Sequence, residues 1–239
     1  MMEKSRCLGT GTFISIGSPV VTEIVSFMGY DWLMFDMEHG CINEGNLLQN
    51  LQAVRNPLTK IIVRVREANP TIISRVLDAG AHGIMVPHVS SAEMATAVVD
   101  AMYYPPRGSR GFSTSVRSMQ FGFEPVKDTL IWEPPLFLAQ IENREGVEAA
   151  DAIAAVPGVD MLFVGPRDLS LDLAVMPDPM DFEEALARVA KAAVNVGKQA
   201  GILVRNMGDL EILRNYGYSA LAIGSDLGAL KNGYKQFKI

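Results

Sequence analysis

Two apolar runs decide the fold of this chain of 239 residues: Leu136-Phe137-Leu138-Ala139 and Met161-Leu162-Phe163-Val164. Each is typical of a strand buried on both faces, and each leads into a short polar cluster. A helix-length segment at about 144–155 separates the two runs. The pattern predicts a strand–helix–strand unit, in which the carboxyl ends of two parallel strands lie side by side.

A carboxylate follows each of these strands, Glu142 after the first and Asp168 after the second. Two converging carboxylates with no basic side chain between them indicate an oxygen-rich site for a divalent cation. The alternative at this point is that both carboxylates only cap the helices that follow.

The same alternation of strand and helix runs along the chain. Further strands are predicted at about 12–16, 32–35, 61–63, 84–86, 200–204 and 220–223, with helices between them. Eight such units predict a single (β/α)8 barrel over residues 1–239, with an insertion at about 103–135 and a last helix at about 226–237. An open doubly wound sheet is the structural alternative, but no Gly-x-Gly-x-x-Gly motif follows the first strand.

Composition narrows the class of protein. The net charge of −6 argues against a nucleic-acid partner, and no apolar run is long enough to span a membrane. The two cysteines, Cys7 and Cys41, form no metal or redox motif, which favours a reducing cytoplasm.

Barrel enzymes carry their chemistry at the carboxyl ends of the strands, and titratable residues gather there in this sequence. Asp36 stands three residues before His39, so its carboxylate could fix the imidazole tautomer; the alternative is a histidine satisfied by backbone, with Glu38 as a helix cap. Arg64 follows three β-branched residues, so we expect its side chain to leave the barrel core and meet an anion; the alternative is an ion pair with Asp36 or Glu38. His88, after a proline, is expected to be a loop residue.

No lysine is placed to form an imine with a ketone. The lysines fall at the amino ends of strands, on helices, in the insertion or near the termini: Lys4, Lys60, Lys127, Lys191, Lys198, Lys231, Lys235 and Lys238. If this barrel makes or breaks carbon–carbon bonds next to a ketone, a metal ion must therefore stabilise the developing charge.

Several motifs occur together in a fixed order: 36–40 (Asp-Met-Glu-His-Gly), 63–64 (Val-Arg), 86–87 (Val-Pro), 105–111 (Pro-Pro-Arg-Gly-Ser-Arg-Gly), 140–142 (Gln-Ile-Glu) and 165–170 (Gly-Pro-Arg-Asp-Leu-Ser). With them the chain resembles, over nearly its whole length, the HpcH/HpaI aldolases, class II pyruvate aldolases of the phosphoenolpyruvate/pyruvate barrel superfamily. The resemblance implies a metal-dependent carbon–carbon lyase. Such an enzyme cleaves a 4-hydroxy-2-oxoacid, such as 4-hydroxy-2-oxoheptanedioate or a 2-dehydro-3-deoxy sugar acid, to pyruvate and an aldehyde by retro-aldol through an enolate.

The resemblance also implies roles for individual residues. Glu142 and Asp168 would bind Mg²⁺, Mn²⁺ or Co²⁺, with no organic cofactor. Arg64 would stabilise the enolate, and His39, oriented by Asp36, would belong to the acid–base system. Glu38 would contact these groups and hold them in position. The substrate-binding residues would be Gln140, Gly165, Pro166, Arg167 and Ser170.

The resemblance further implies a homo-oligomer, a hexamer with exchanged C-terminal helices, and a role in processes such as aromatic compound catabolism. Two residues depart from the family pattern: His88 replaces a usual apolar residue, and Met176 stands where a glycine is common. Both border the loops that receive the aldehyde half, so the acceptor stays open. The alternative functions are an oxaloacetate decarboxylase or citrate-lyase β-type lyase on the same site, and a non-enzymatic pyruvate- or oxalate-binding barrel.

Overall fold

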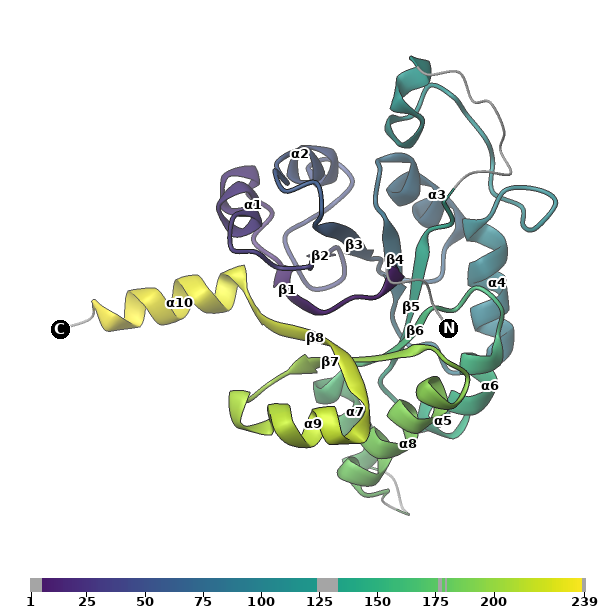
Figure 1. The fold of residues 1–239 in the computed structure, drawn as a ribbon, viewed down its shortest axis with the longest axis vertical. Coiled ribbons are helices and arrows are strands. Elements are labelled where there is room, and N and C mark those ends of the chain that lie inside the picture. Colours follow the sequence, from purple (N-terminus) through teal and green to yellow (C-terminus); the bar gives the residue numbers. More distant parts are fainter. Residues whose placement is uncertain (1–5, 124–132, 176–177, 179, 238–239) are drawn as a thin grey trace.

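The computed structural model describes residues 6–123, 133–175, 178 and 180–237; Lys127 and Met176 lie outside them. Eight parallel strands close into a barrel in chain order, with β8 pairing back to β1 (Figure 1). The strands are β1 (Thr10–Ile14), β2 (Trp32–Asp36), β3 (Lys60–Arg64), β4 (Gly83–Val86), β5 (Leu136–Ile141), β6 (Met161–Val164), β7 (Gln199–Val204) and β8 (Tyr218–Ser225). The prediction of a (β/α)8 barrel is confirmed.

Helices cover the outside of the barrel. They are α1 (Pro19–Ser26), α2 (Leu47–Gln52), α3 (Pro70–Asp78), α4 (Ala92–Met102), α5 (Arg144–Glu148), α6 (Ala150–Ala155), α7 (Pro166–Val175), α8 (Phe182–Asn195), α9 (Leu210–Tyr216) and α10 (Asp226–Gln236), with short 3₁₀ helices η2 (Arg117–Gly122) and η4 (Met207–Asp209). Among the described residues, no helix combines the length and the apolar character needed to cross a bilayer.

One segment differs from the sequence-based expectation. The segment at 144–155 forms two helices that meet at Ala149 rather than one continuous helix. The polar cluster after β6 forms the first turn of α7, which begins at Pro166. Proline suits this position because its fixed φ angle matches a helix and its missing N–H has no partner there anyway. Asp168 and Ser170 are therefore helical residues.

A two-residue period sorts the side chains of the strands between the inside and the outside of the barrel. Trp32, Met34, Leu138 and Phe163 belong to the inner cluster, whereas their neighbours along each strand pack under the helices. Trp32 meets Phe163 edge to face, with ring centroids 6.2 Å apart. Gly11 makes room for the indole, because a Cβ there would lie 2.2 Å from a Trp32 ring carbon.

The same period carries polar side chains into the mouth of the barrel. Asp36 follows Trp32 and Met34 in phase, and Arg64 follows Ile62. On β5, Gln140 and then Glu142 continue the phase of Leu138. All four of these polar residues are buried. The barrel geometry therefore collects two carboxylates, a guanidinium and an amide at one end.

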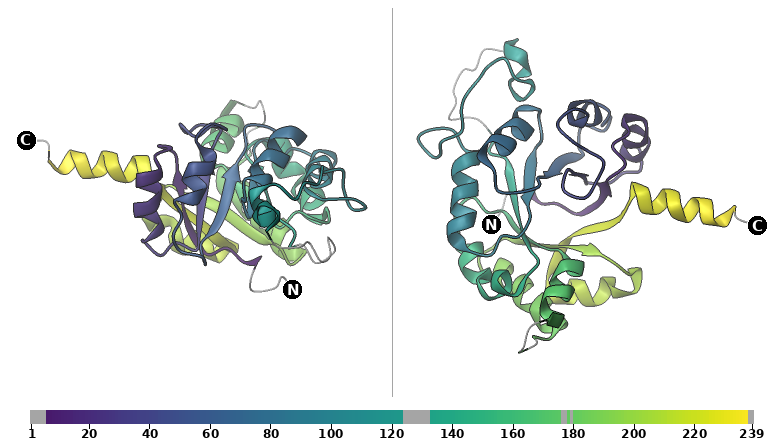
Figure 2. Two further views of the ribbon diagram at one scale, coloured as in Figure 1. Left: turned by 90° about the horizontal axis from the view of Figure 1, so that it is seen from above. Right: turned by 180° about the vertical axis from the view of Figure 1, so that it is seen from behind.

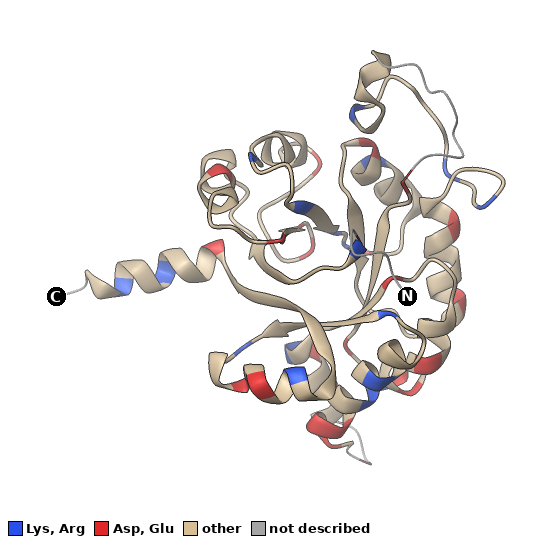
Figure 3. Ribbon diagram, in the orientation of Figure 1, with Lys and Arg blue, Asp and Glu red and all other residues tan. Residues whose placement is uncertain are grey.

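The insertion begins against α3 and α4. Arg110 forms an ion pair with Asp78 at 2.6 Å, and Arg117 Nη1 donates to the backbone oxygen of Ala79 at 2.9 Å. Acidic and basic residues are interspersed over the outer helices of the molecule (Figure 3).

Helix α10 extends away from the barrel in every view (Figures 1 and 2). Of its eleven residues only Asp226 is buried. The Asp226 carboxylate accepts hydrogen bonds from the backbone N–H groups of Ser15 at 2.8 Å and Ile16 at 3.0 Å, and the Ser225 hydroxyl caps the helix through Gly228 N. These contacts fix the start of α10 to the end of β1, and the rest of the helix leaves the barrel.

We expect His82 to make the free energy of unfolding depend on pH. Its Nδ1 accepts from Ile61 N at 2.9 Å, and desolvation of the ring, helped by the nearby Lys60 charge, lowers the pKa of His82 below its ordinary 6.5. The folded protein therefore binds a proton at His82 less readily than the unfolded chain does. The contribution of His82 to stability is present above pH 6.5 and decreases as the pH falls below that value, and it is small because the residue is exposed to solvent. His82→Asn keeps an acceptor that does not titrate. Urea unfolding at pH 7.5 and pH 5 should show that the free energy of unfolding of the variant, relative to that of the wild type, is higher at pH 5 than at pH 7.5.

A control for this prediction is His39→Asn, since the His39 side chain is 67% exposed. The free energy of unfolding of His39→Asn relative to the wild type should change little between the two pH values. If the free energy of unfolding of His82→Asn relative to the wild type were also the same at both pH values, the assignment to His82 would be wrong.

Candidate active site at the barrel mouth

A buried ion pair joins the ends of β2 and β3. Arg64 donates from Nε to Asp36 Oδ1 at 3.0 Å and from Nη2 to Asp36 Oδ2 at 2.8 Å, a two-point contact that fixes the plane of the guanidinium. The guanidinium also lies 5.2 Å from the centroid of the Phe13 ring. The expectation that Arg64 leaves the barrel core is wrong, because its place in the strand period turns it inward; it does meet anions there.

Burial alone would lower the pKa of Arg64, but its hydrogen bond to Asp36 and the charges of Asp36, Glu38 and Glu142 raise that pKa on balance. Arg64 is therefore a permanent, oriented cation at the mouth. Asp36 Oδ1 also accepts from the backbone N–H groups of Glu38 and His39, at 3.1 Å each. Asp36 thus holds the backbone of His39, whereas the expectation was that it would orient the ring.

Glu38 lies beside Arg64 and faces the open mouth. Its Oε2 is 3.0 Å from Arg64 Nη1, yet this buried oxygen accepts no hydrogen bond. Burial is the main reason that the pKa of Glu38 is raised; Glu142 and Asp36 add to the rise, and Arg64 and His39 oppose it. The ionised Glu38 carboxylate is therefore under-compensated and would gain from a further cation.

Glu142 lies one residue beyond the end of β5, and its side chain is only 1% exposed. Its Oε1 accepts from the backbone N–H of His88 at 2.8 Å, and its Oε2 accepts from Gln140 Nε2. The second amide atom of the buried Gln140, Oε1, has no hydrogen-bond partner among the described residues. Buried polar atoms of this kind are costly unless a ligand or an ordered water satisfies them.

The absence of a side chain at Gly165 leaves room for the Glu142 carboxylate. A Cβ at this position would lie 2.5 Å from Glu142 Oε2 and 2.9 Å from Gln140 Nε2. The glycine directly after β6 therefore lets the carboxylate of the neighbouring strand end come close. Pro166 follows it, buried, as the first residue of α7.

The remaining predicted residues lie further from this cluster of contacts. Arg167 and Asp168 are exposed on the first turn of α7, and within the described part of the chain the Asp168 carboxylate has no hydrogen bond or ion pair. The Ser170 hydroxyl donates to the backbone oxygen of Arg167 at 2.9 Å. His39 is exposed, with Nε2 3.8 Å from Glu38 Oε2.

His88 is the residue that the sequence-based reasoning missed. Its φ angle of 53° is left-handed, which costs a side chain about 1–2 kcal/mol. This turn brings its backbone N–H onto Glu142 and places its Nδ1 3.2 Å from the same oxygen. The available signal was the departure from the apolar residue that the family resemblance led us to expect after Val86-Pro87.

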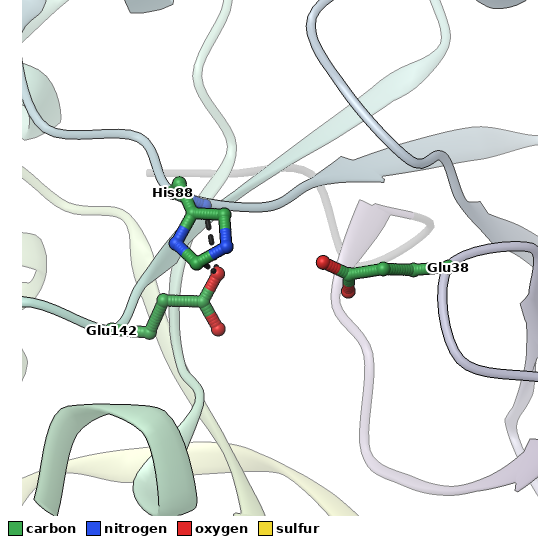
Figure 4. Close-up of side chains that lie close together, drawn as sticks. All are labelled: Glu38, His88 and Glu142. Carbon is green, nitrogen blue, oxygen red and sulfur yellow. Dashed lines mark hydrogen bonds and ion pairs between the residues drawn. The ribbon is translucent and has the colours of Figure 1, made fainter. Parts of the chain in front are cut away.

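Glu38, His88 and Glu142 together form a candidate metal site (Figure 4). Each offers one ligand atom, and these atoms lie within 4.8 Å of one another. The residues come from the ends of β2, β4 and β5. Two carboxylates that face each other with an imidazole, beside the unpaired Oε1 of Gln140, fit a divalent cation in donor type and charge.

A separate hollow of about 650 Å³ lies at the opposite end of the barrel. Lys60, His82 and Glu133 are among its lining residues, and they stand near the amino ends of strands. Barrel enzymes place their chemistry at the other end. The mouth with Glu142 is therefore the better candidate site.

A closed parallel barrel with a carboxylate-rich mouth defines the class of (β/α)8 barrel enzymes. The model of the HpcH/HpaI aldolase/citrate lyase family matches residues 10–233. A 5-keto-4-deoxy-D-glucarate aldolase from Escherichia fergusonii is 35% identical over 225 residues, which cover 93% of this chain and 88% of the relative.

Solved structures agree with this match. An HpcH/HpaI aldolase/citrate lyase family protein from Burkholderia cenocepacia J2315 has a TM-score of 0.88 and 31% identity, covering 97% of this chain and 93% of that one. An HpcH/HpaI aldolase from Desulfitobacterium hafniense DCB-2 has a TM-score of 0.86 and 28% identity, covering 98% and 92%. The chain belongs to the HpcH/HpaI aldolase/citrate lyase family, and it is a carbon–carbon lyase of the aldolase type. The resemblance inferred from its motifs is confirmed.

We expect Gly165→Ala to displace the Glu142 carboxylate. The added methyl group meets Glu142 Oε2 and the Gln140 amide, so the protein should lose about 1–3 kcal/mol of stability, as overpacked sites do. It should also bind divalent cations more weakly, as measured by calorimetry on metal-free protein.

Gly111→Ala is the matched control, because nothing lies within 4 Å of a Cβ at that position. Its stability and its metal affinity should match those of the wild type. Wild-type metal affinity in Gly165→Ala would contradict the role given to Gly165.

Proposed function

We propose that this protein cleaves a 2-dehydro-3-deoxy sugar acid, or a related 4-hydroxy-2-oxoacid, to pyruvate and an aldehyde. The observation that carries the proposal is the buried, oriented Arg64 beside the Glu38 and Glu142 carboxylates at the barrel mouth. The keto-deoxy sugar acid in the name of the Escherichia fergusonii relative supports this substrate class.

Different residues of the chain act on different steps of the retro-aldol cleavage. A base removes the proton of the 4-hydroxyl group, the C3–C4 bond breaks to release the aldehyde, and the electron pair of that bond becomes an enolate whose charge lies on the keto oxygen. Protonation of the enolate at C3 then gives pyruvate. Arg64, held in plane by Asp36, is an oriented cation that stabilises this oxygen. The exposed His39 imidazole serves the proton transfers, directly or through a water.

We propose that Glu142 and Asp168 hold a divalent cation, either Mg²⁺, Mn²⁺ or Co²⁺. When bound, this cation acts as a Lewis acid that draws charge toward the keto oxygen. Gln140 orients Glu142 through its amide. Gly165 immediately precedes α7, and Pro166, Arg167 and Ser170 lie within its first five residues. Except at Pro166, which has no N–H, backbone N–H groups at this end of the helix can donate hydrogen bonds to a substrate carboxylate.

The function is tested by pyruvate release in an assay coupled to lactate dehydrogenase. The substrates are 5-keto-4-deoxy-D-glucarate, other 4-hydroxy-2-oxoacids and oxaloacetate, offered with and without Mg²⁺, Mn²⁺ or Co²⁺ after treatment with EDTA. We expect metal-dependent cleavage that falls by at least about 10²-fold in Glu142→Gln and in Asp168→Asn, since a Lewis acid contributes several kcal/mol.

The control for these variants is Glu148→Gln, which removes an exposed carboxylate paired with Arg144 on α5. It should keep wild-type turnover. Full turnover in EDTA would exclude the metal, full activity in Asp168→Asn would exclude that ligand, and release of pyruvate from oxaloacetate alone would indicate a decarboxylase.

We also propose that the protein forms a homo-oligomer, a hexamer in which C-terminal helices are exchanged. Helix α10 carries an exposed apolar stripe at helical spacing, formed by Leu227, Leu230 and Tyr234 and continued by Phe237 just beyond its end. Exposed apolar stripes of this size are typical of surfaces that another chain covers. A second copy of this chain is the occupant that the family resemblance favours.

We expect Leu230→Glu combined with Tyr234→Glu to break this association. Two charges on the stripe oppose burial, so light scattering after gel filtration should show a smaller particle than the wild type. Asn232→Glu adds a charge on the other face of α10 and should leave the mass unchanged. A monomeric wild type, or an unchanged mass in the double variant, would contradict the exchange.

A further inference from the structure

The side chain of His88 has no assigned part in the reaction described above. It follows β4 and Pro87 at the rim of the mouth, and its side chain is 62% exposed. Its backbone is fixed at both ends: the N–H donates to Glu142 Oε1 at 2.8 Å, and the carbonyl oxygen accepts from Ser90 Oγ at 3.1 Å. The left-handed conformation is thus held by neighbours on the β4 and β5 loops.

The His88 ring stands where a metal ligand would stand. Its Nδ1 lies 3.2 Å from Glu142 Oε1, but the hydrogen bond between the two residues is made by the backbone N–H and not by the ring. Two ligand atoms that bind one cation at about 2.1 Å and at a right angle are about 3.0 Å apart. The observed separation matches this arrangement.

Glu38 lies on the far side of the same gap. Its ligand oxygen lies within 4.8 Å of the ligand atoms of His88 and Glu142, which allows all three atoms to surround one cation (Figure 4). Oε1 of Gln140, a residue only 2% exposed, has no hydrogen-bond partner among the described residues, whereas Oε2 of Glu38 is ion-paired with Arg64 Nη1 at 3.0 Å. The gap therefore has three ligand atoms around it and one unsatisfied acceptor on Gln140, the residue that donates to Glu142.

We propose that the His88 imidazole is a nitrogen ligand of the divalent cation, bound together with Glu142. This inference rests on the proposed function only for the presence of the cation. A nitrogen ligand favours the borderline cation Co²⁺ most, and Mn²⁺ to a smaller degree, over Mg²⁺, which prefers an all-oxygen shell. His88 thereby sets the metal preference of this chain.

The test uses the full-length protein, freed of metal and loaded with one equivalent of Mn²⁺. Pulsed electron paramagnetic resonance detects ¹⁴N bound directly to Mn²⁺. The chain has three histidines, His39, His82 and His88, so each is replaced by Asn in turn. Asn suits the left-handed backbone at position 88 and offers no imidazole nitrogen.

We expect a ¹⁴N signal in the wild type, in His39→Asn and in His82→Asn, and none in His88→Asn. Calorimetry should show that His88→Asn lowers Mn²⁺ affinity by about 10-fold or more, with a smaller change for Mg²⁺. His88→Gly, which also accepts a positive φ, should behave as His88→Asn does, which separates the loss of the ring from a folding defect.

Absence of ¹⁴N coupling in Mn²⁺-loaded wild type, or its persistence in His88→Asn, would overturn the inference. The experiments distinguish a failure of the His88 proposal from a failure of the proposed function. Metal-dependent pyruvate release without ¹⁴N coupling overturns only the role of His88. A ¹⁴N signal that depends on His88, in a protein that cleaves none of the oxoacids, supports the ligand and overturns the proposed function.

Discussion

The buried carboxylate of Glu142 is the constraint on which the mouth of this barrel depends. A carboxylate at 1% exposure has lost its water and needs donors from the protein or a bound cation. The backbone N–H of His88 and the amide of Gln140 are these donors. Because Gly165 has no side chain, there is room for the Glu142 carboxylate and the Gln140 amide to meet. Residues from β4, β5 and the loop after β6 are thus tied to one group.

The sequence was sufficient to predict the barrel and most of the inward-facing polar residues. The apolar runs identify the strands, and a strict two-residue period then fixes which side of each strand faces inward. Asp36, Arg64, Gln140 and Glu142 all continue an inward phase set by apolar residues on the same strand. The same period places Arg64 inside, two residues after the inward-facing Ile62, and it outweighs the β-branched run as a guide to the direction of the side chain.

The rest of the site could not be predicted because it depends on loops. His88 reaches Glu142 through a left-handed residue, and nothing in the local sequence demands that conformation from a histidine. Asp168 was expected at the carboxyl end of the strand, but Pro166 opens a helix directly after Gly165, so Asp168 projects from a helical turn. The role of Asp36 differs for a related reason: backbone N–H groups two and three residues along compete with the His39 ring for its carboxylate.

The two sides of the mouth differ in how their charged groups are held. Arg64 is fixed by Asp36 on one side, and Glu142 is held by neutral donors on the other. Asp36 locks Arg64 by two hydrogen bonds between adjacent strands, so the cation is oriented before any substrate arrives. On the same side, Glu38 is ion-paired with Arg64 at 3.0 Å. Across the gap, Gln140 donates to Glu142 but its carbonyl oxygen has no partner among the described residues. A cation bound at Glu142 would therefore find an unpaired oxygen on the adjacent side chain.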